Sequence, residues 1–243
     1  FVSVALLGAG TLTGLTGTAA GAAPPAAADC VSAADEAAAL AAARACGTAV
    51  QNLAGRTETH ETFANPDGTW TAKIYAGPVR TRGADGGWVP IDLTMRAEAD
   101  GSVAPVAHPA GLRLSGAKGA GKHDVVSILV GGKRVSLGWD GPLDAPVLDG
   151  NRATYQEVKP GVDLVIEATR TAVEQFFVVK DRGAADDVAT LQLPLGTGGL
   201  TTAPDGGGGL LLRDAGGTTV GTVPTPEMWD SSIDPATGSP KRR

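Results

Sequence analysis

The stretch VVSILVGGKRVSLGW, residues 125–139, decides the fold class of this chain. It holds two short runs, VVSILV and RVSLGW, that are rich in valine and other large apolar residues. In the second run apolar and polar residues alternate. Short runs of β-branched and aromatic residues bounded by glycines predict β-strands rather than helices. The stretch therefore predicts two strands.

Similar runs recur from about residue 48 onward, for example TETHETFA, TWTAKIYA, GWVPIDLTM, VDLVIEA, VEQFFVVK, ATLQLPL and GLLLRD. Turn signals separate them: Asp-Gly pairs begin at residues 67, 85, 100, 140, 149 and 205, and NPDG at 65–68 predicts a hairpin. No run is followed by a long helical period, which excludes a doubly wound parallel sheet. We expect residues 48–232 to form a mainly β domain, either an antiparallel β-sandwich or an extended multi-strand meander.

The first 28 residues carry no charge, and VSVALLGAG leads into the small-residue stretch TAAGAAPPAAA. This order is typical of a secretory signal peptide, with cleavage after Ala22 or Ala28. A transmembrane helix is the competing interpretation, but five glycines make a poor bilayer span. Because the chain begins with Phe1 and has no basic leader, we expect the start of the signal to be missing. Export without stable membrane insertion after cleavage is the prediction.

Residues 29–47 are rich in alanine and predict a helical arm, with Ser32 as its N-cap and Gly47 at its end. The only two cysteines, Cys30 and Cys46, flank this segment. A continuous helix would place them on the order of 20 Å apart, beyond the roughly 7 Å Cα separation of a disulfide. Either the helix bends back or the two thiols do not pair with each other. Leu40 is the only large apolar residue of the helical run, so we expect the run to bury little.

The stretch GAKGAGKHD, residues 116–124, has the glycine spacing of a phosphate-binding loop. His123 stands where that motif needs a hydroxyl, and the following run predicts a strand instead of the helix that would face the phosphate. We therefore expect a Gly-Lys connector and no nucleotide cofactor. A net charge of −6 gives no basic surface for nucleic acid.

Catalytic and metal-binding patterns are also missing from the sequence. His60, His108 and His123 are scattered, no Gly-x-Ser-x-Gly elbow occurs, and neither the histidines nor the cysteines have ligand spacing. We expect no catalytic residue, no metal and no cofactor. The four tryptophans favour core positions in a chain so poor in aromatics. Alternatively, Trp88 and Trp139 contact a glycan.

The segment ATYQEVKPGVDLVIEATRTAVEQFFVVKD, 153–181, contains the words Tyr-x-x-Val-x-Pro-Gly-Val-Asp-Leu and Phe-Val-Val. It resembles an N-terminal β-rich module of large secreted proteins from high-GC Gram-positive bacteria. In those proteins the module precedes LamG-like jelly-roll domains or the RHS/YD repeats of polymorphic toxins. The resemblance implies no catalytic residues. Pro160 and Gly161 predict a tight turn, and Asp163 is expected to cap it by accepting a backbone N–H.

Three functions remain open after these observations. The first is a non-catalytic extracellular β module that begins a larger secreted or cell-surface protein and serves as scaffold or presentation stalk. Its partners are downstream domains, reached through a polar linker or tail at 233–243. The second is a carbohydrate- or cell-wall-binding module that uses exposed tryptophans. The third, less favoured, is a secreted hydrolase.

Overall fold

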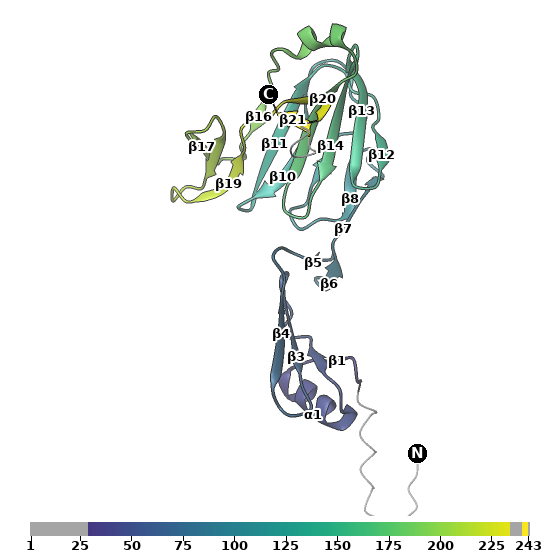
Figure 1. The fold of residues 1–243 in the computed structure, drawn as a ribbon, viewed down its shortest axis with the longest axis vertical. Helices are drawn as coiled ribbons and strands as arrows, with labels where there is room; N and C mark the ends of the chain where they lie inside the picture. The colour runs from purple at the N-terminus through teal and green to yellow at the C-terminus, as the bar shows by residue number, and fades with distance from the viewer. Residues whose placement is uncertain (1–28, 234–239, 243) are drawn as a thin grey trace, which may run out of the picture. The chain divides into compact units, whose positions relative to one another are not determined.

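The computed structural model describes residues 29–233 and 240–242 (Figure 1). The predicted signal peptide, 1–28, lies outside the described residues. The chain is mainly β, with several antiparallel sheets, so the predicted fold class is confirmed at that level. It divides into two compact units. Unit 1 contains residues 29–54 and 63–71, and unit 2 contains the other described residues.

Unit 1 contains the helix α1, which spans Glu36–Cys46. Asp35 is its N-cap and accepts a hydrogen bond from the N–H of Ala38 at 2.9 Å. The prediction that Ser32 caps the helix is wrong, because Ser32 belongs to the short strand β1 (Ser32–Ala33). Gly47 ends the helix as predicted, with a φ of 67° that favours glycine.

Cys30 and Cys46 form a disulfide with a Cα–Cα distance of 5.8 Å. The helix begins only after β1, so Cys30 is not on it and the two cysteines are not separated by a full helical run. β1 pairs in parallel with β2 (Val50–Asn52), which follows the helix in the chain. The open question about these thiols is thereby settled in favour of a bridge.

The helix packs against the rest of unit 1 through small side chains. Ala39 and Ala43 are fully buried in one cluster with Val50 and Ala64. Alanine lets the helix approach its neighbours closely, although each methyl group contributes little apolar area. The expectation that this segment buries little is therefore wrong for its inner face.

The hairpin predicted at NPDG is confirmed. It connects β3 (His60–Ala64) to β4 (Trp70–Ile74), and these strands are neighbours in the sheet β1-β2-β3-β4. The N–H of Asn65 donates to the carbonyl of Thr69 at 2.9 Å. The Asp67 carboxylate accepts bonds from the hydroxyl and the N–H of Thr69, and these bonds lower the pKa of Asp67.

In all six predicted Asp-Gly turns the glycine has a positive φ that other residues rarely adopt. The values are 88° at Gly68, 77° at Gly86, 80° at Gly101, 152° at Gly141, 55° at Gly150 and 86° at Gly206.

Unit 2 contains a six-stranded sheet of order β16-β11-β10-β9-β8-β7 and a four-stranded sheet of order β12-β13-β14-β15 (Figure 1). The strands of the first are β7 (Asp92–Ala97), β8 (Val103–Ala107), β9 (Arg113–Leu114), β10 (Lys122–Val130), β11 (Lys133–Asp140) and β16 (Leu195–Gly196). Those of the second are β12 (Val147–Asp149), β13 (Arg152–Lys159), β14 (Val162–Ala168) and β15 (Val173–Val179). The stretch 125–139 therefore lies on β10 and β11, which pair antiparallel.

Both sheets contribute side chains to one hydrophobic cluster. From the six-stranded sheet come Met95, Val103, Leu114, Val125, Val126 and Trp139, and from the four-stranded sheet come Ala153, Tyr155, Leu164, Ile166 and Ala168. Along β14, burial alternates at every second residue. This is the pattern of a strand with one face on a core.

Smaller sheets complete unit 2. They are β5-β6 (Arg80–Arg82 and Trp88–Pro90), β17-β18-β19 (Thr201–Pro204, Leu210–Arg213 and Thr219–Val223) and β20-β21 (Trp229–Ile233 and Pro240–Arg242), and a short 3-10 helix η1 spans Arg182–Val188. Residues 240–242 therefore pair with β20, although the sequence assigned them to a polar linker or tail.

Candidate functional site

The Pro160-Gly161 turn joins β13 to β14, with Lys159 paired to Val162. Gly161 has a φ of 73°, which favours glycine. A Cβ at this position would lie 2.8 Å from the Ala184 Cβ and 2.9 Å from an Asp181 carboxylate oxygen. Both backbone conformation and close packing therefore require glycine here.

Three charged side chains gather beside this turn: Glu157, Asp163 and Lys180. Asp163 Oδ1 accepts bonds from the Glu157 N–H at 2.9 Å and from Lys180 Nζ at 2.8 Å. The Glu157 carboxylate also pairs with Lys180 and accepts the N–H of Gly161 at 2.7 Å. The expected capping by Asp163 is present, although the N–H that it caps belongs to Glu157, before the turn.

The electrostatics of this cluster keep all three groups charged. The hydrogen bonds to Asp163 and then Glu157 raise the pKa of Lys180. Partial burial opposes ionisation of Asp163, but its bonds to Lys180 and Glu157 lower its pKa overall. Glu157 has a φ of 51°, which is uncommon for a residue other than glycine. The cluster stabilises an unusual backbone segment, and its amine is protonated and not nucleophilic.

Tyr155, which begins the motif, is buried in the shared core. Its hydroxyl donates to the carbonyl oxygen of Ser115, which follows β9. Burial raises the pKa of Tyr155 to about 12. The phenol therefore stays neutral and connects a strand of one sheet to the chain of the other.

Two of the three histidines that the sequence singled out, His108 and His123, bond to backbone groups through their rings. His108 Nε2 lies 2.9 Å from the Thr169 carbonyl oxygen, and Nδ1 accepts the Ala110 N–H at 3.1 Å. His123 Nε2 lies 2.7 Å from the Gly119 oxygen and 3.0 Å from the Gly141 oxygen. Through these contacts the imidazole rings hold loops of the backbone in place.

The state of His108 predicts a pH dependence. Burial lowers its pKa below the ordinary value of 6.5, so the folded chain favours the neutral ring. The resulting stability is present above pH 6.5 and is lost as pH falls through the lower folded pKa. Urea unfolding of unit 2 between about pH 7.5 and pH 5 should show this loss, and His108→Asn should reduce the loss. An identical pH dependence in the variant would contradict the prediction.

A cavity of about 330 Å³ lies within unit 2 around Trp88. Its lining residues are Arg56, Glu61, Tyr75, Val79, Arg80, Trp88, Val89 and Pro90. Glu61 pairs with Arg80 and accepts the Tyr75 hydroxyl at 2.9 Å, and this hydrogen bond raises the pKa of Tyr75. Arg80 also donates to the carbonyl of Thr57 at 2.6 Å.

The tryptophans fall into different environments. Trp88 is half-buried, lines this cavity, and has the Arg82 guanidinium 3.7 Å from its ring centroid. Trp139 is only 5% exposed and packs against Phe177, so it takes the core position that the sequence favoured and not the exposed position that the alternative of glycan contact needs. It borders a second cavity of about 230 Å³. Trp70 and Trp229 are 40% and 46% exposed, so the expectation of core positions fails for them.

The sequence did not single out Glu61, Tyr75 or Arg80. Trp88 in GWVPIDLTM was the only signal for this cavity. Glu61 and Arg80 are separated by 19 residues, and no spacing rule relates them. Only the fold brings them together.

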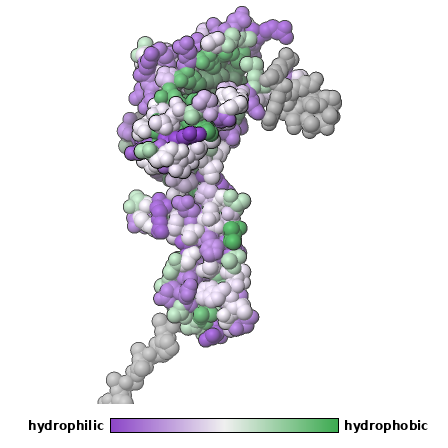
Figure 2. Space-filling model, turned by 90° about the vertical axis from the view of Figure 1, so that its left-hand side faces the viewer, coloured by the Kyte–Doolittle hydropathy of each residue, from purple (hydrophilic) through white to green (hydrophobic). Residues whose placement is uncertain are grey.

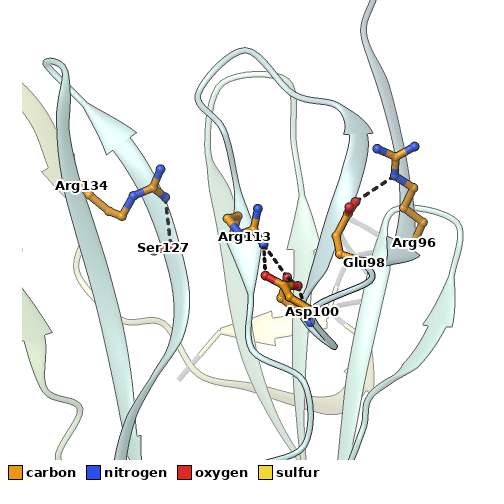
Figure 3. Close-up of polar contacts among 7 residues, drawn as sticks. Arg96, Glu98, Asp100, Arg113, Ser127 and Arg134 are labelled. Carbon is orange, nitrogen blue, oxygen red and sulfur yellow. Dashed lines mark hydrogen bonds and ion pairs between the residues drawn. The ribbon is translucent and has the colours of Figure 1, made fainter. Parts of the chain in front are cut away.

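The described surface of the six-stranded sheet carries further ion pairs (Figure 3). Arg96 pairs with Glu98 at 2.9 Å, and Arg113 pairs with Asp100 at 2.8 Å. Arg134 donates to the Ser127 hydroxyl at 3.1 Å. Exposed pairs of this kind contribute little to stability and keep the face polar.

An apolar area occurs elsewhere on unit 2. Figure 2 shows hydrophobic residues gathered together on the face that it draws. Exposed apolar side chains of this unit include Val178 on β15 and Met228 beside β20. The rings of Phe176 and Trp229 meet edge to face, with centroids 5.9 Å apart, so β15 and β20 pack together.

Comparison with protein-family models, with curated proteins and with solved structures finds no match for this chain. Within residues 29–233 and 240–242, no helix has the length and apolar character needed to cross a membrane. The same described residues contain no cluster of three histidine, cysteine or acidic side chains placed to bind a metal.

Proposed function

We propose that the chain is a non-catalytic extracellular β module of a larger secreted or cell-surface protein, in which it serves as scaffold or presentation stalk. The observation that carries this proposal is that the residues of the Tyr-x-x-Val-x-Pro-Gly-Val-Asp-Leu motif make structural contacts. Gly161 and Asp163 make contacts that stabilise the β13–β14 hairpin, and Tyr155 connects β13 to Ser115, which follows β9 in the other sheet. The requirements of folding thus account for the most distinctive residues of this segment.

Two further features support the proposal. The Cys30–Cys46 disulfide is compatible with an oxidising, extracellular location. The common core of the six-stranded and four-stranded sheets is that expected of an antiparallel β-sandwich, an architecture frequent in extracellular modules. Residues 1–28 would be removed on export, and downstream domains of LamG-like or RHS type would be the partners.

A fusion tests this proposal. The full chain is produced in a Gram-positive bacterium with a starting methionine and a short basic leader in place of the start that we expect to be missing, and it is followed by a folded reporter enzyme. We expect reporter activity outside the cell, and we expect it to depend on residues 1–28. Reporter activity confined to the cytoplasm would contradict the proposed extracellular role.

The cavity around Trp88 favours a second candidate function, carbohydrate or cell-wall binding. Trp88 and Tyr75 both line it, and aromatic rings commonly pack on the apolar faces of sugars. Its volume is within the usual range for small-ligand sites. Of the two tryptophans that the sequence singled out, only Trp88 would contact the ligand under this second function.

A further inference from the structure

We propose that the Asp149-Gly150 pair is a site of spontaneous isoaspartate formation in the folded chain, whereas hydrogen bonds protect the other five Asp-Gly pairs. The chain contains six such pairs, and all six lie in turns. This inference goes beyond the proposed function, because it concerns a covalent change of the chain itself. Water is the only co-reactant that the change needs.

The chemistry belongs to the Asp-Gly sequence, because a glycine leaves the peptide nitrogen after the aspartate open to approach. The Gly150 nitrogen attacks Cγ of the protonated Asp149 carboxyl group. The new N–Cγ bond closes a five-membered succinimide ring, and the carboxyl hydroxyl leaves as water together with the amide proton. Water then adds to a ring carbonyl. Cleavage of the original peptide N–C bond leaves isoaspartate, with the same atoms and electrons as aspartate.

Two groups must be free for the attack. The carboxyl group must be protonated, because the ionised form is a poor electrophile, and hydrogen bonds donated to it favour the ionised form. The glycine N–H must leave any carbonyl that it binds, because its nitrogen has to turn toward Cγ. A hydrogen bond of the folded chain at either group therefore slows the reaction.

Five of the six pairs are held at one of these groups or at both. The carboxylates of Asp67, Asp85, Asp100 and Asp205 accept the backbone N–H of Thr69, Gly87, Ser102 and Gly207, respectively. The N–H groups of Gly68, Gly86, Gly101 and Gly141 donate to the backbone carbonyls of Asn65, Gly83, Glu98 and Gly121, respectively. Hydrogen bonds are the largest cause of a lowered pKa at Asp67, Asp100 and Asp205, so these carboxyl groups hold less of the reactive protonated form.

The Asp149-Gly150 pair differs from the others at both groups. Both residues are exposed, and no hydrogen bond among the described residues holds the Asp149 carboxylate or the Gly150 N–H. Asp149 ends β12 and pairs with Arg152, so Gly150 lies in a two-residue turn. β12 has three residues and lies at the edge of its sheet, where local opening costs less than in a central strand.

The modification would disturb a contact between the two large sheets of unit 2. The Gly150 carbonyl accepts the N–H of Met95 on β7 at 2.7 Å, and the Asn151 side chain donates to the Ala168 carbonyl at 2.8 Å. Isoaspartate adds one atom to the main chain, because the chain then runs through Cβ and Cγ of residue 149. The turn can no longer keep both bonds in their present geometry. We therefore expect the modified chain to unfold at a lower urea concentration.

The experiment incubates the full chain at near-neutral pH for several weeks and then cleaves it with trypsin. Cleavage after Arg134 and Arg152 gives one peptide, 135–152, that contains both Asp149-Gly150 and Asp140-Gly141. Electron-transfer fragmentation in a mass spectrometer distinguishes isoaspartate from aspartate at each position. We expect isoaspartate at residue 149 to form at least about fivefold faster than at residue 140, the factor that corresponds to one hydrogen bond of ordinary strength.

Two controls separate the fold from the local sequence. In urea that unfolds unit 2 the hydrogen bonds are lost, so the rates at residues 149 and 140 should become similar. Asp149→Glu keeps the charge but would need a six-membered ring, so it should show no isomerised residue at 149. Its urea midpoint should also stay unchanged during incubation, whereas that of the unsubstituted chain should fall.

Equal rates at residues 149 and 140 in the folded chain would overturn the inference, and so would faster formation at any of the other four pairs. A difference that persists in urea would overturn it as well, because the local sequence and not the fold would then select the site. An unchanged urea midpoint in chains that carry isoaspartate at residue 149 would contradict the structural consequence assigned to the turn.

Discussion

Replacing Gly161 with alanine is expected to lower the free energy of unfolding of unit 2 by about 2 to 5 kcal/mol. The φ of 73° is unfavourable for alanine. The new methyl group would also collide with the Ala184 Cβ and the Asp181 carboxylate, at 2.8 and 2.9 Å. Asp181 caps the 3-10 helix η1 by accepting the N–H of Ala184, so the collision disturbs this cap as well. Urea unfolding followed by tryptophan fluorescence measures the loss.

Gly150→Ala is the matched control for this prediction. Gly150 occupies the β12–β13 turn with a φ of 55°, but a Cβ there would meet no atom within 4 Å. It should therefore lose only the backbone contribution, about 1 to 2 kcal/mol. If the two variants lost equal stability, the close packing assigned to Gly161 would be wrong.

Replacing both cysteines with serine is expected to destabilise unit 1 by about 3 kcal/mol, the typical effect of a bridge across a short loop. The buried apolar side chains of this unit are Ala39, Ala42, Ala43, Val50 and Ala64. Such small side chains bury limited apolar area, so the disulfide accounts for much of the stability. Hydrogen exchange of the α1 amides should become faster.

The β13–β14 amides provide the internal control, because these strands belong to unit 2. Their exchange should be unchanged in the Cys30→Ser, Cys46→Ser variant. Each unit must be followed separately, since two compact units need not unfold in one transition. Unchanged protection of α1 would show that packing alone holds the helix.

Much of the strand pattern could be predicted from the sequence because it depends on local rules. Alternation in β14 and the glycines of the Asp-Gly turns both report backbone conformation within a few residues. The start of α1 was misplaced because Ser32 is a good N-cap by type. What prevents it from capping is the pairing of β1 with β2, a contact with residues beyond the helix.

The candidate site was less accessible to sequence reasoning. Sequence reasoning could not distinguish Trp88 from Trp139. Trp88 lines a cavity, whereas Trp139 is buried against Phe177. Which face of a strand meets the core depends on the packing of distant sheets. The same holds for Glu61 and Arg80, whose ion pair exists only because β3 and β5 are brought together.

We propose that this chain is an extracellular module, and the Cys30–Cys46 disulfide closes its first unit. The most direct measurement is the thiol content of the exported reporter fusion, obtained by alkylation and mass spectrometry of protein collected outside the cell. We predict that Cys30 and Cys46 take up no alkyl group before reduction and one each after reduction. Fusion that stays inside the cell with both cysteines alkylated would contradict the claim.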